Sequence, residues 1–191
     1  AVAFVTEIAP ELNAIDGIDV AVCPPFIAIP AVAHALAATR IGVGAQNMYY
    51  ETSGAYTGEV SAGMLVDINA RYGLVGHSER RQYHAEDNEL VAAKFAAAQA
   101  AGLVPILCVG ETLAERDGDR TEDVVGTQLA AVVARCGPAA FGNRGQHLRA
   151  QPPFLGEFRA QPLDIAAEVR DVAHRAAQRA VHPRQPHRPA G

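Results

Sequence analysis

Residues 72–87 of the chain read YGLVGHSERRQYHAED, and this stretch decides how the fold is interpreted. Its first four residues are apolar or aromatic around one glycine, as in a short buried strand, and the charged residues after Ser78 are typical of a helix. The strand predicted over 72–76 ends at Gly76, so His77 stands where the strand gives way to the helix. We interpret the stretch as one strand–helix unit that carries a histidine at the carboxyl end of its strand.

The same order of strand and helix repeats on both sides of this unit. The pattern predicts strands at 18–23, 41–45, 72–76 and 103–109, and helices at 2–14, 29–39, 61–70, 86–101 and 120–135. Strands that are apolar throughout and alternate with helices indicate a parallel sheet covered by helices, which is the α/β class. The periodicity leaves two architectures open, a doubly wound sheet and a closed barrel. In both of them the functional side chains belong at the carboxyl ends of the strands.

The composition excludes several classes of protein. The 191 residues include three cysteines at wide spacings, which argues against a disulfide framework and for a reducing compartment. No apolar run reaches the ~18 residues of a membrane span, and no signal segment opens the chain, so we expect no membrane association. The sequence shows no dinucleotide fingerprint, no phosphate-binding P-loop and no zinc-ligand spacing, so we expect no cofactor and no metal.

The net charge of −5 conceals a change in composition near residue 143. Residues 1–143 hold 8 basic and 17 acidic residues, whereas residues 144–191 hold 8 arginines, no lysine and 4 acidic residues. We therefore divide the chain into a domain at 1–143 and an Arg/Pro-rich tail at 144–191, which we interpret as disordered or frameshifted. A genuine alternative terminus and a chimeric gene stay open. The tail lacks interleaved aromatic residues, so we expect no nucleic-acid binding.

His77 is the main candidate for chemistry, and two interpretations of it stand side by side. In one, the ring caps or packs at the strand–helix junction; in the other, it points into a site at the strand end. The partial positive charge and free N–H groups of a helix N-terminus disfavour imidazolium, so a neutral ring can polarise a carbonyl through its own N–H. We expect Glu79 to cap the helix, to pair with a nearby base, or to do both. Arg80, Arg81 and Glu86 are interpreted as a structural ion-pair set.

Four segments together carry a resemblance to a known family. They are VAVCPPF at 20–26, IGVGAQNMYYETSGAYTGEVSAGML at 41–65, YGLVGHSERRQYHAED at 72–87 and LVPILCVGETLAER at 103–116. In their order and spacing they resemble the triose-phosphate isomerases over residues 1–143. The resemblance implies an incomplete (β/α)8 TIM barrel, with its site at the carboxyl ends of the strands. It also implies the interconversion of dihydroxyacetone phosphate and glyceraldehyde 3-phosphate through an enediol(ate), without a cofactor.

The resemblance further implies roles for residues and a place in the cell. His77 matches the family's electrophile, and this family is the usual example of a histidine kept neutral by a helix N-terminus and paired with a glutamate base. Glu79 matches an acidic residue at the edge of the family's site, so the resemblance makes His77 and Glu79 the candidate catalytic residues. The loop Gln46–Glu59, with Thr57 near its tip, matches the loop that forms a homodimer. The implied setting is glycolysis and gluconeogenesis in the cytoplasm.

Two parts of the family pattern have no match in the sequence. The family's first strand, which ends in an Asn-x-Lys motif that holds the substrate phosphate, is missing, and Lys94, the only lysine, lies mid-helix and is no counterpart. The later strand that carries the base glutamate is missing too, and Glu157 receives no role. Without the base glutamate and the lysine that binds the substrate phosphate, we expect weak or no activity from this chain. The alternative is a non-catalytic α/β half-barrel fragment or interaction module, whose four predicted strands leave two open edges.

Overall fold

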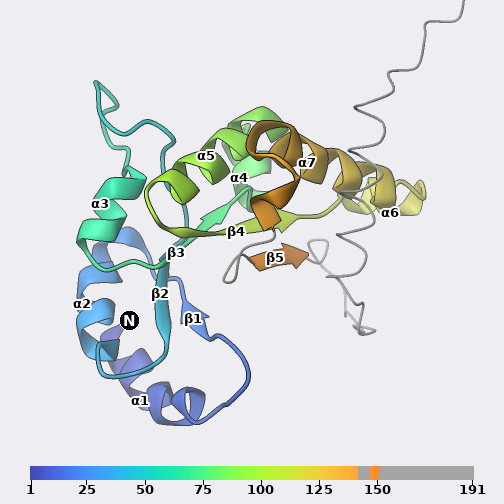
Figure 1. Cartoon of the computed structure of the whole chain (residues 1–191). Helices are drawn as coiled ribbons and strands as arrows, with labels where there is room; N and C mark the ends of the chain where they lie inside the picture. The colour runs from blue at the N-terminus through green and yellow to red at the C-terminus, as the bar shows by residue number, and fades with distance from the viewer. Residues whose placement is uncertain (142–146, 151–191) are drawn as a thin grey trace, which may run out of the picture.

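The computed structural model describes residues 1–141 and 147–150, which form a parallel sheet with helices packed beside it (Figure 1). The strands are β1 (Ala21–Val22), β2 (Gly42–Ala45), β3 (Tyr72–Val75), β4 (Val104–Val109) and β5 (His147–Ala150). The helices are α1 (Val2–Asn13), α2 (Ile29–Leu36), α3 (Ala62–Asp67), α4 (Ser78–Tyr83), α5 (Asn88–Ala100), α6 (Leu113–Asp117) and α7 (Thr121–Cys136), with 3-10 helices η1 (Phe26–Ala28) and η2 (Pro138–Phe141). Every strand pairing is parallel, and the sheet order β1-β2-β3-β4-β5 follows the chain. The predicted α/β class is confirmed.

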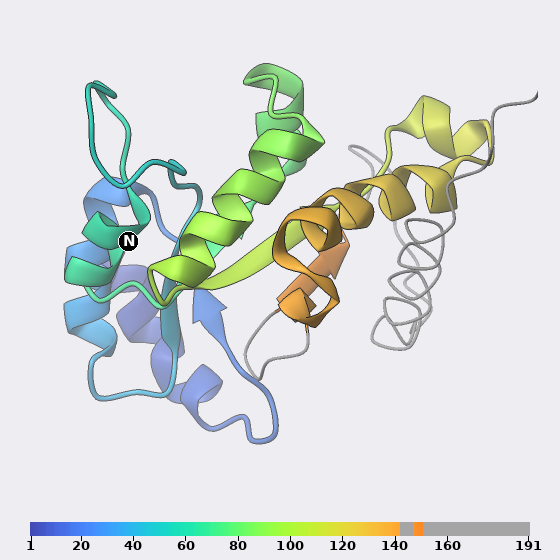
Figure 2. The ribbon, with the colours of Figure 1, turned by 45° about the horizontal axis from the view of Figure 1, so that its top comes forward.

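The largest part of the core lies between the sheet and helices α5 and α7. These two helices pack against each other and against β4, and Figure 2 shows them side by side. Val91 and Phe95 of α5, Leu107 of β4 and Val132 of α7 are each at most 1% exposed. Burying such side chains contributes roughly 1.5–3 kcal/mol each. This packing holds the carboxyl ends of β3 and β4 in fixed positions.

The sheet is open within the described residues. Pairing runs from β1 to β5 in a single series, and no pairing between β1 and β5 closes it among residues 1–141 and 147–150. These residues therefore form part of a barrel, as the sequence predicted. Each outermost strand presents a backbone edge, which is the usual place for another strand to pair.

Apart from the two 3-10 helices, helix α6 and strand β5 were not predicted. Helix α6 begins at Thr112, whose side chain accepts from the Glu115 N–H (3.3 Å) while the Glu115 carboxylate accepts from the Thr112 N–H (2.8 Å). Strand β5 pairs with β4 from Ile106↔His147 to Val109↔Ala150, so the sheet has five strands within the described residues, where four were predicted. β5 also lies inside the segment that was interpreted as a disordered or frameshifted tail.

The rest of the predicted tail, residues 151–191, lies outside the described residues, as do 142–146. In the part of the chain that the structure describes, none of the helices has the length and apolar character needed to cross a bilayer.

Candidate functional site

The carboxyl ends of β1 to β4 meet at one edge of the sheet, because the strands are parallel. The segment after β1 and the loop after β2 are joined there by a hydrogen bond from Gln46 Nε2 to the Cys23 carbonyl (3.0 Å). Gly76 and His77 follow β3, and Gly110 follows β4. The structure therefore brings together the strand ends that the sequence singled out.

His77 lies at a sharp turn between β3 and α4. Gly76 has φ +75°, a conformation that glycine adopts at little cost, and His77 is the N-cap of α4 with φ −53° and ψ 142°. The His77 side chain is 32% exposed, so its ring is not packed inside the hydrophobic core. This position agrees with both interpretations, because the ring caps α4 by accepting from the Glu79 N–H and is still partly exposed at the strand end.

A hydrogen bond to the His77 ring selects one tautomer of its neutral form. The backbone N–H of Glu79 donates to His77 Nδ1 at 3.3 Å, so Nδ1 acts as an acceptor. A neutral imidazole has one acceptor and one donor nitrogen, which leaves the proton on Nε2. The Glu79 carboxylate is 54% exposed, and its Oε2 lies 3.8 Å from Nδ1. In the neutral ring, this geometry therefore makes Nε2–H the donor.

Arg81 does not join the predicted ion-pair set. Its Nε donates to the Gly76 carbonyl (3.0 Å), and its Nη1 donates to Asn88 Oδ1 (2.7 Å) at the first residue of α5. Burial lowers the pKa of Arg81, while the nearby Glu86 charge acts in the opposite direction. The predicted set was therefore wrong in this member, since Arg81 contacts a backbone carbonyl and an amide instead.

Lys94 takes the place that was predicted for Arg81. Its Nζ lies 2.5 Å from Glu86 Oε1 and 2.8 Å from Asn47 Oδ1, and the same Glu86 oxygen lies 2.5 Å from Arg80 Nε. The side chains of Lys94 and Glu86 are only 3% and 2% exposed. The ammonium group is thus enclosed in a structural network, which agrees with the prediction that Lys94 is no counterpart of the family's phosphate-binding lysine.

Burial and pairing act in opposite directions on this network. Burial alone raises the pKa of Glu86, but the hydrogen bonds and charges of Lys94 and Arg80 outweigh it and hold the pKa below its usual value. Burial lowers the pKa of Lys94, and the Glu86 carboxylate opposes that change. A buried pair of this kind is ionised only because each partner neutralises the other.

Two side chains hold the end of β4, and sequence reasoning missed the first of them, Gln128. The side-chain amide of Gln128 accepts from the Gly110 N–H (2.9 Å) and donates to the Gly110 carbonyl (2.8 Å). The Glu111 carboxylate, 3% exposed, accepts from Arg116 Nε (2.7 Å) and from the Thr121 hydroxyl (3.3 Å). A polar residue on the buried face of α7 was the available signal for Gln128.

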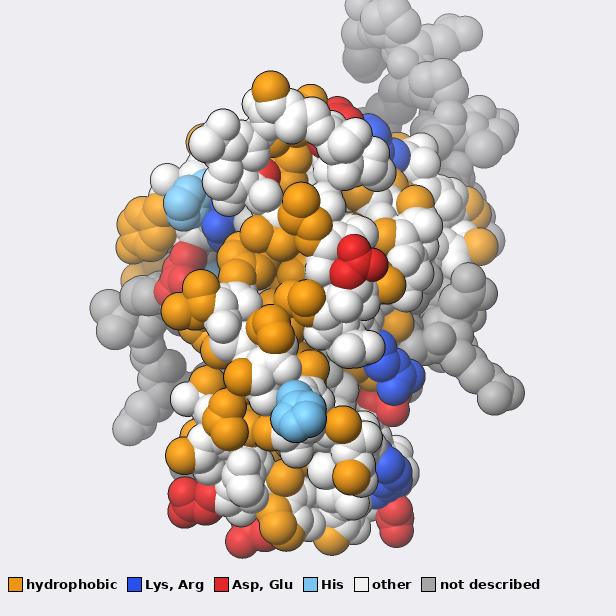
Figure 3. All heavy atoms as spheres, turned by 90° about the vertical axis from the view of Figure 1, so that its left-hand side faces the viewer, with side chains coloured by type: hydrophobic (Ala, Val, Ile, Leu, Met, Phe, Trp, Pro, Cys, Tyr) orange, Lys and Arg blue, Asp and Glu red, His pale blue; other side chains and the backbone are white. Residues whose placement is uncertain are grey.

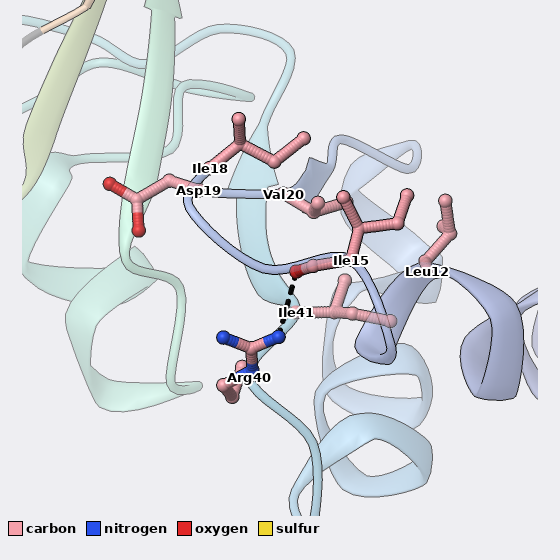
Figure 4. Close-up of a pocket in the computed structure, with 7 residues that line it drawn as sticks. All are labelled: Leu12, Ile15, Ile18, Asp19, Val20, Arg40 and Ile41. Carbon is pink, nitrogen blue, oxygen red and sulfur yellow. Dashed lines mark hydrogen bonds between the residues drawn. The ribbon is translucent and has the colours of Figure 1, made fainter.

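A small hollow of about 60 Å³ lies at the opposite end of the strands. Its lining comes from the segments before β1 and before β2: Leu12, Ile15, Ile18, Asp19, Val20, Arg40 and Ile41 (Figure 4). The Arg40 guanidinium donates to the Ile15 carbonyl at 2.7 Å. The hollow is remote in the fold from the strand end that carries His77. In the described residues we find no cluster of His, Cys, Asp and Glu side chains suited to a metal ion.

The parallel strands, the helices packed beside them and the histidine at a strand end are typical of a segment of an α/β barrel. Comparison with known sequences then gives the family. The profile described as triosephosphate isomerase matches residues 1–144, and the chain belongs to that family. The predicted resemblance is confirmed.

Named relatives agree with this assignment. The triosephosphate isomerase of Stenotrophomonas maltophilia (strain K279a) is 54% identical over 127 residues, which cover 66% of this chain and 51% of the relative. That of Serratia proteamaculans (strain 568) is 50% identical over 131 residues, or 69% of this chain and 51% of the relative. That of Xanthomonas oryzae pv. oryzae (strain PXO99A) is 51% identical over 142 residues, or 73% and 57%. The chain spans about half the length of the curated relatives it matches.

Proposed function

We propose that the site at His77 serves the interconversion of dihydroxyacetone phosphate and glyceraldehyde 3-phosphate. The observation that carries the proposal is the hydrogen bond from the Glu79 N–H to His77 Nδ1, which leaves Nε2–H as the free donor of an accessible ring. In an aldose–ketose isomerisation a proton leaves the carbon beside a carbonyl and returns to the neighbouring carbon. Negative charge develops on the oxygen, and a neutral N–H donor can stabilise it or give up its proton.

In this proposal His77 is the catalytic residue and Glu79 sets the ring's orientation through its backbone N–H. The sequence supplies no recognised counterpart of the family's base glutamate or phosphate-binding lysine. We therefore expect the chain by itself to convert triose phosphate only weakly, because the electrophile acts without a positioned base and without binding energy from the phosphate. Because the chain belongs to this family, we also propose that it acts in glycolysis and gluconeogenesis in the cytoplasm. The proposed reaction requires no cofactor.

Replacing His77 with glutamine is expected to lower the chain's isomerase rate about tenfold in a coupled assay with glyceraldehyde 3-phosphate, because the donor to the developing oxyanion is lost. His84→Gln is the matched control, since His84 is exposed at the end of the same helix and has no proposed role. It should keep the rate of the unaltered chain. Equal rates for the unaltered chain and His77→Gln would contradict the proposal.

The open sheet favours a second candidate, a non-catalytic half-barrel that acts through its strand edges. Binding of phosphoglycolate, measured by NMR, distinguishes the two candidates. Phosphoglycolate resembles the enediolate, so it should shift the imidazole resonances of His77 if the site binds triose phosphate. No shift, together with no turnover above His77→Gln, would support the non-catalytic half-barrel.

We also propose that the chain forms a homodimer through the loop Gln46–Glu59. The loop stands away from the rest of the molecule, between β2 and α3 (Figure 1), and residues 52–59 are exposed. At the base of the loop the Tyr49 N–H donates to the Val60 carbonyl (2.8 Å). The Tyr49 and Tyr56 rings also pack together, with their centroids 4.8 Å apart. A projecting but internally braced loop of this kind is suited to insertion into a partner.

The surface beside α2 and α3 is apolar enough to receive such a loop. Figure 3 views the side of the molecule that carries these helices and shows a band of hydrophobic side chains across it. Ile27 of η1 is 95% exposed and Met64 of α3 is 56% exposed. An exposed surface on which large apolar side chains gather often marks a protein–protein interface.

The dimer is tested with a matched pair of isoleucine variants. Ile27→Arg is expected to convert a dimer to a monomer in sedimentation equilibrium, because the buried interface would then hold an unpaired charge. Ile18→Arg, at a position 61% exposed beside the hollow of Figure 4, should leave the dimer intact. A monomeric unaltered chain, or equal behaviour of the two variants, would count against the proposed interface.

A further inference from the structure

We propose that Arg81 is a positioning residue that holds His77 in its productive orientation. The inference rests on the proposed function of His77, but its geometry can be tested without any turnover. The hydrogen bonds of the Arg81 side chain within the described residues go to the Gly76 carbonyl and to Asn88, not to the His77 ring. Arg81 acts on the peptide that leads into His77.

The first contact fixes that peptide. Arg81 Nε donates to the Gly76 carbonyl at 3.0 Å. The Gly76 carbonyl and the His77 N–H belong to the same planar peptide unit, so fixing one fixes the other. Because His77 then has φ −53°, the direction in which its side chain leaves the backbone is determined as well.

The second contact anchors Arg81 to a rigid part of the fold. Arg81 Nη1 donates to Asn88 Oδ1 at 2.7 Å, and Asn88 is the first residue of α5. Helix α5 packs against β3, β4 and α7, so the anchor belongs to the main core. Helix α4 has only six residues, and the Arg81 side chain links it to the end of β3 and to α5 at once.

The third observation is the close fit around the turn. A Cβ atom added at Gly76 would lie 3.0 Å from Arg81 Nη2 and 3.2 Å from the Cys108 carbonyl. The guanidinium therefore lies close to the Gly76 backbone, and a side chain at this position would crowd it. A planar group with donors at fixed angles can make these two bonds at once, whereas a lysine ammonium on a flexible stem cannot reproduce them.

The experiment measures the state of His77 in the whole chain. In nitrogen-15 spectra of the unaltered chain we expect His77 as a single neutral tautomer with Nδ1 unprotonated. Arg81→Lys should give a mixture of tautomers and speed hydrogen exchange of the Glu79 amide about tenfold, because its bond to Nδ1 is no longer held in place. Arg80→Lys is the matched control on the same helix, and it should leave both readouts unchanged.

A second pair of variants separates positioning from general damage to the fold. Asn88→Ala removes the anchor and should change the tautomer ratio in the same direction as Arg81→Lys, whereas Asn88→Asp keeps an acceptor and should restore the single tautomer. If Arg81→Lys and Asn88→Ala leave both readouts as in the unaltered chain, Arg81 does not position His77. If the spectra change as expected but His77→Gln has no effect on the assay, the proposed function fails and the positioning role stands.

Discussion

Replacing Lys94 with methionine is expected to lower the free energy of unfolding by about 3–5 kcal/mol. Methionine fills much of the same volume, so the loss comes from the charge. The Glu86 carboxylate, 2% exposed, would keep its ion pair with Arg80 but lose the one with Lys94, and Asn47 Oδ1 would lose the Lys94 ammonium as a donor. Removing one partner of a buried pair leaves the other charge without compensation, which costs more than the pair contributes.

Urea unfolding measures this loss as a lower midpoint at an unchanged slope. Arg120→Met is the control, because Arg120 pairs with Glu115 at 3.8 Å on the surface with its side chain 58% exposed. Its loss should stay below about 1 kcal/mol. The double variant Lys94→Met/Glu86→Gln should recover part of the stability, since it removes the buried carboxylate that has lost one of its cationic partners. A Lys94→Met loss as small as that of Arg120→Met would refute the role assigned to this network.

The sequence predicted those strands well whose own residues are apolar enough to indicate a buried strand. Val104–Val109 is apolar along its whole length, so its strand character is local. His147–Ala150 contains one large apolar residue, and its strand character comes from pairing with β4, which no local pattern reveals. Helix α6 is too short to show apolar periodicity. Its Thr112–Glu115 capping box was nevertheless readable in the sequence.

The sequence predicted where the candidate site lies in the fold, but it predicted less well which side chains contact one another there. His77 at a strand–helix turn follows from Gly76 and the flanking pattern alone. The partners of Arg81 and Lys94 do not, because they depend on which acceptor the fold brings within reach. Asn47 is 47 residues away from Lys94 in the chain, and the two meet only when β2 and α5 are assembled.

Replacing Gly76 with alanine is expected to destabilise the chain by about 2–5 kcal/mol, the sum of backbone strain and overpacking. At φ +75° an L-residue is strained whatever space surrounds it. The new Cβ would also lie 2.9 Å from Val91 Cγ1, 3.0 Å from Arg81 Nη2 and 3.2 Å from the Cys108 carbonyl. Two of these neighbours belong to the packed core, so they cannot move aside without cost.

Gly102→Ala separates the two contributions to that loss. Gly102 has a similar φ of +86°, but a Cβ added there would meet no atom within 4 Å. Its variant should therefore lose only the strain of about 1–2 kcal/mol. The difference between the two urea midpoints measures how tightly Arg81, Val91 and Cys108 enclose the turn that carries His77. Equal losses at Gly76 and Gly102 would mean that the turn has room to adjust, and that the orientation of His77 is not fixed by its surroundings.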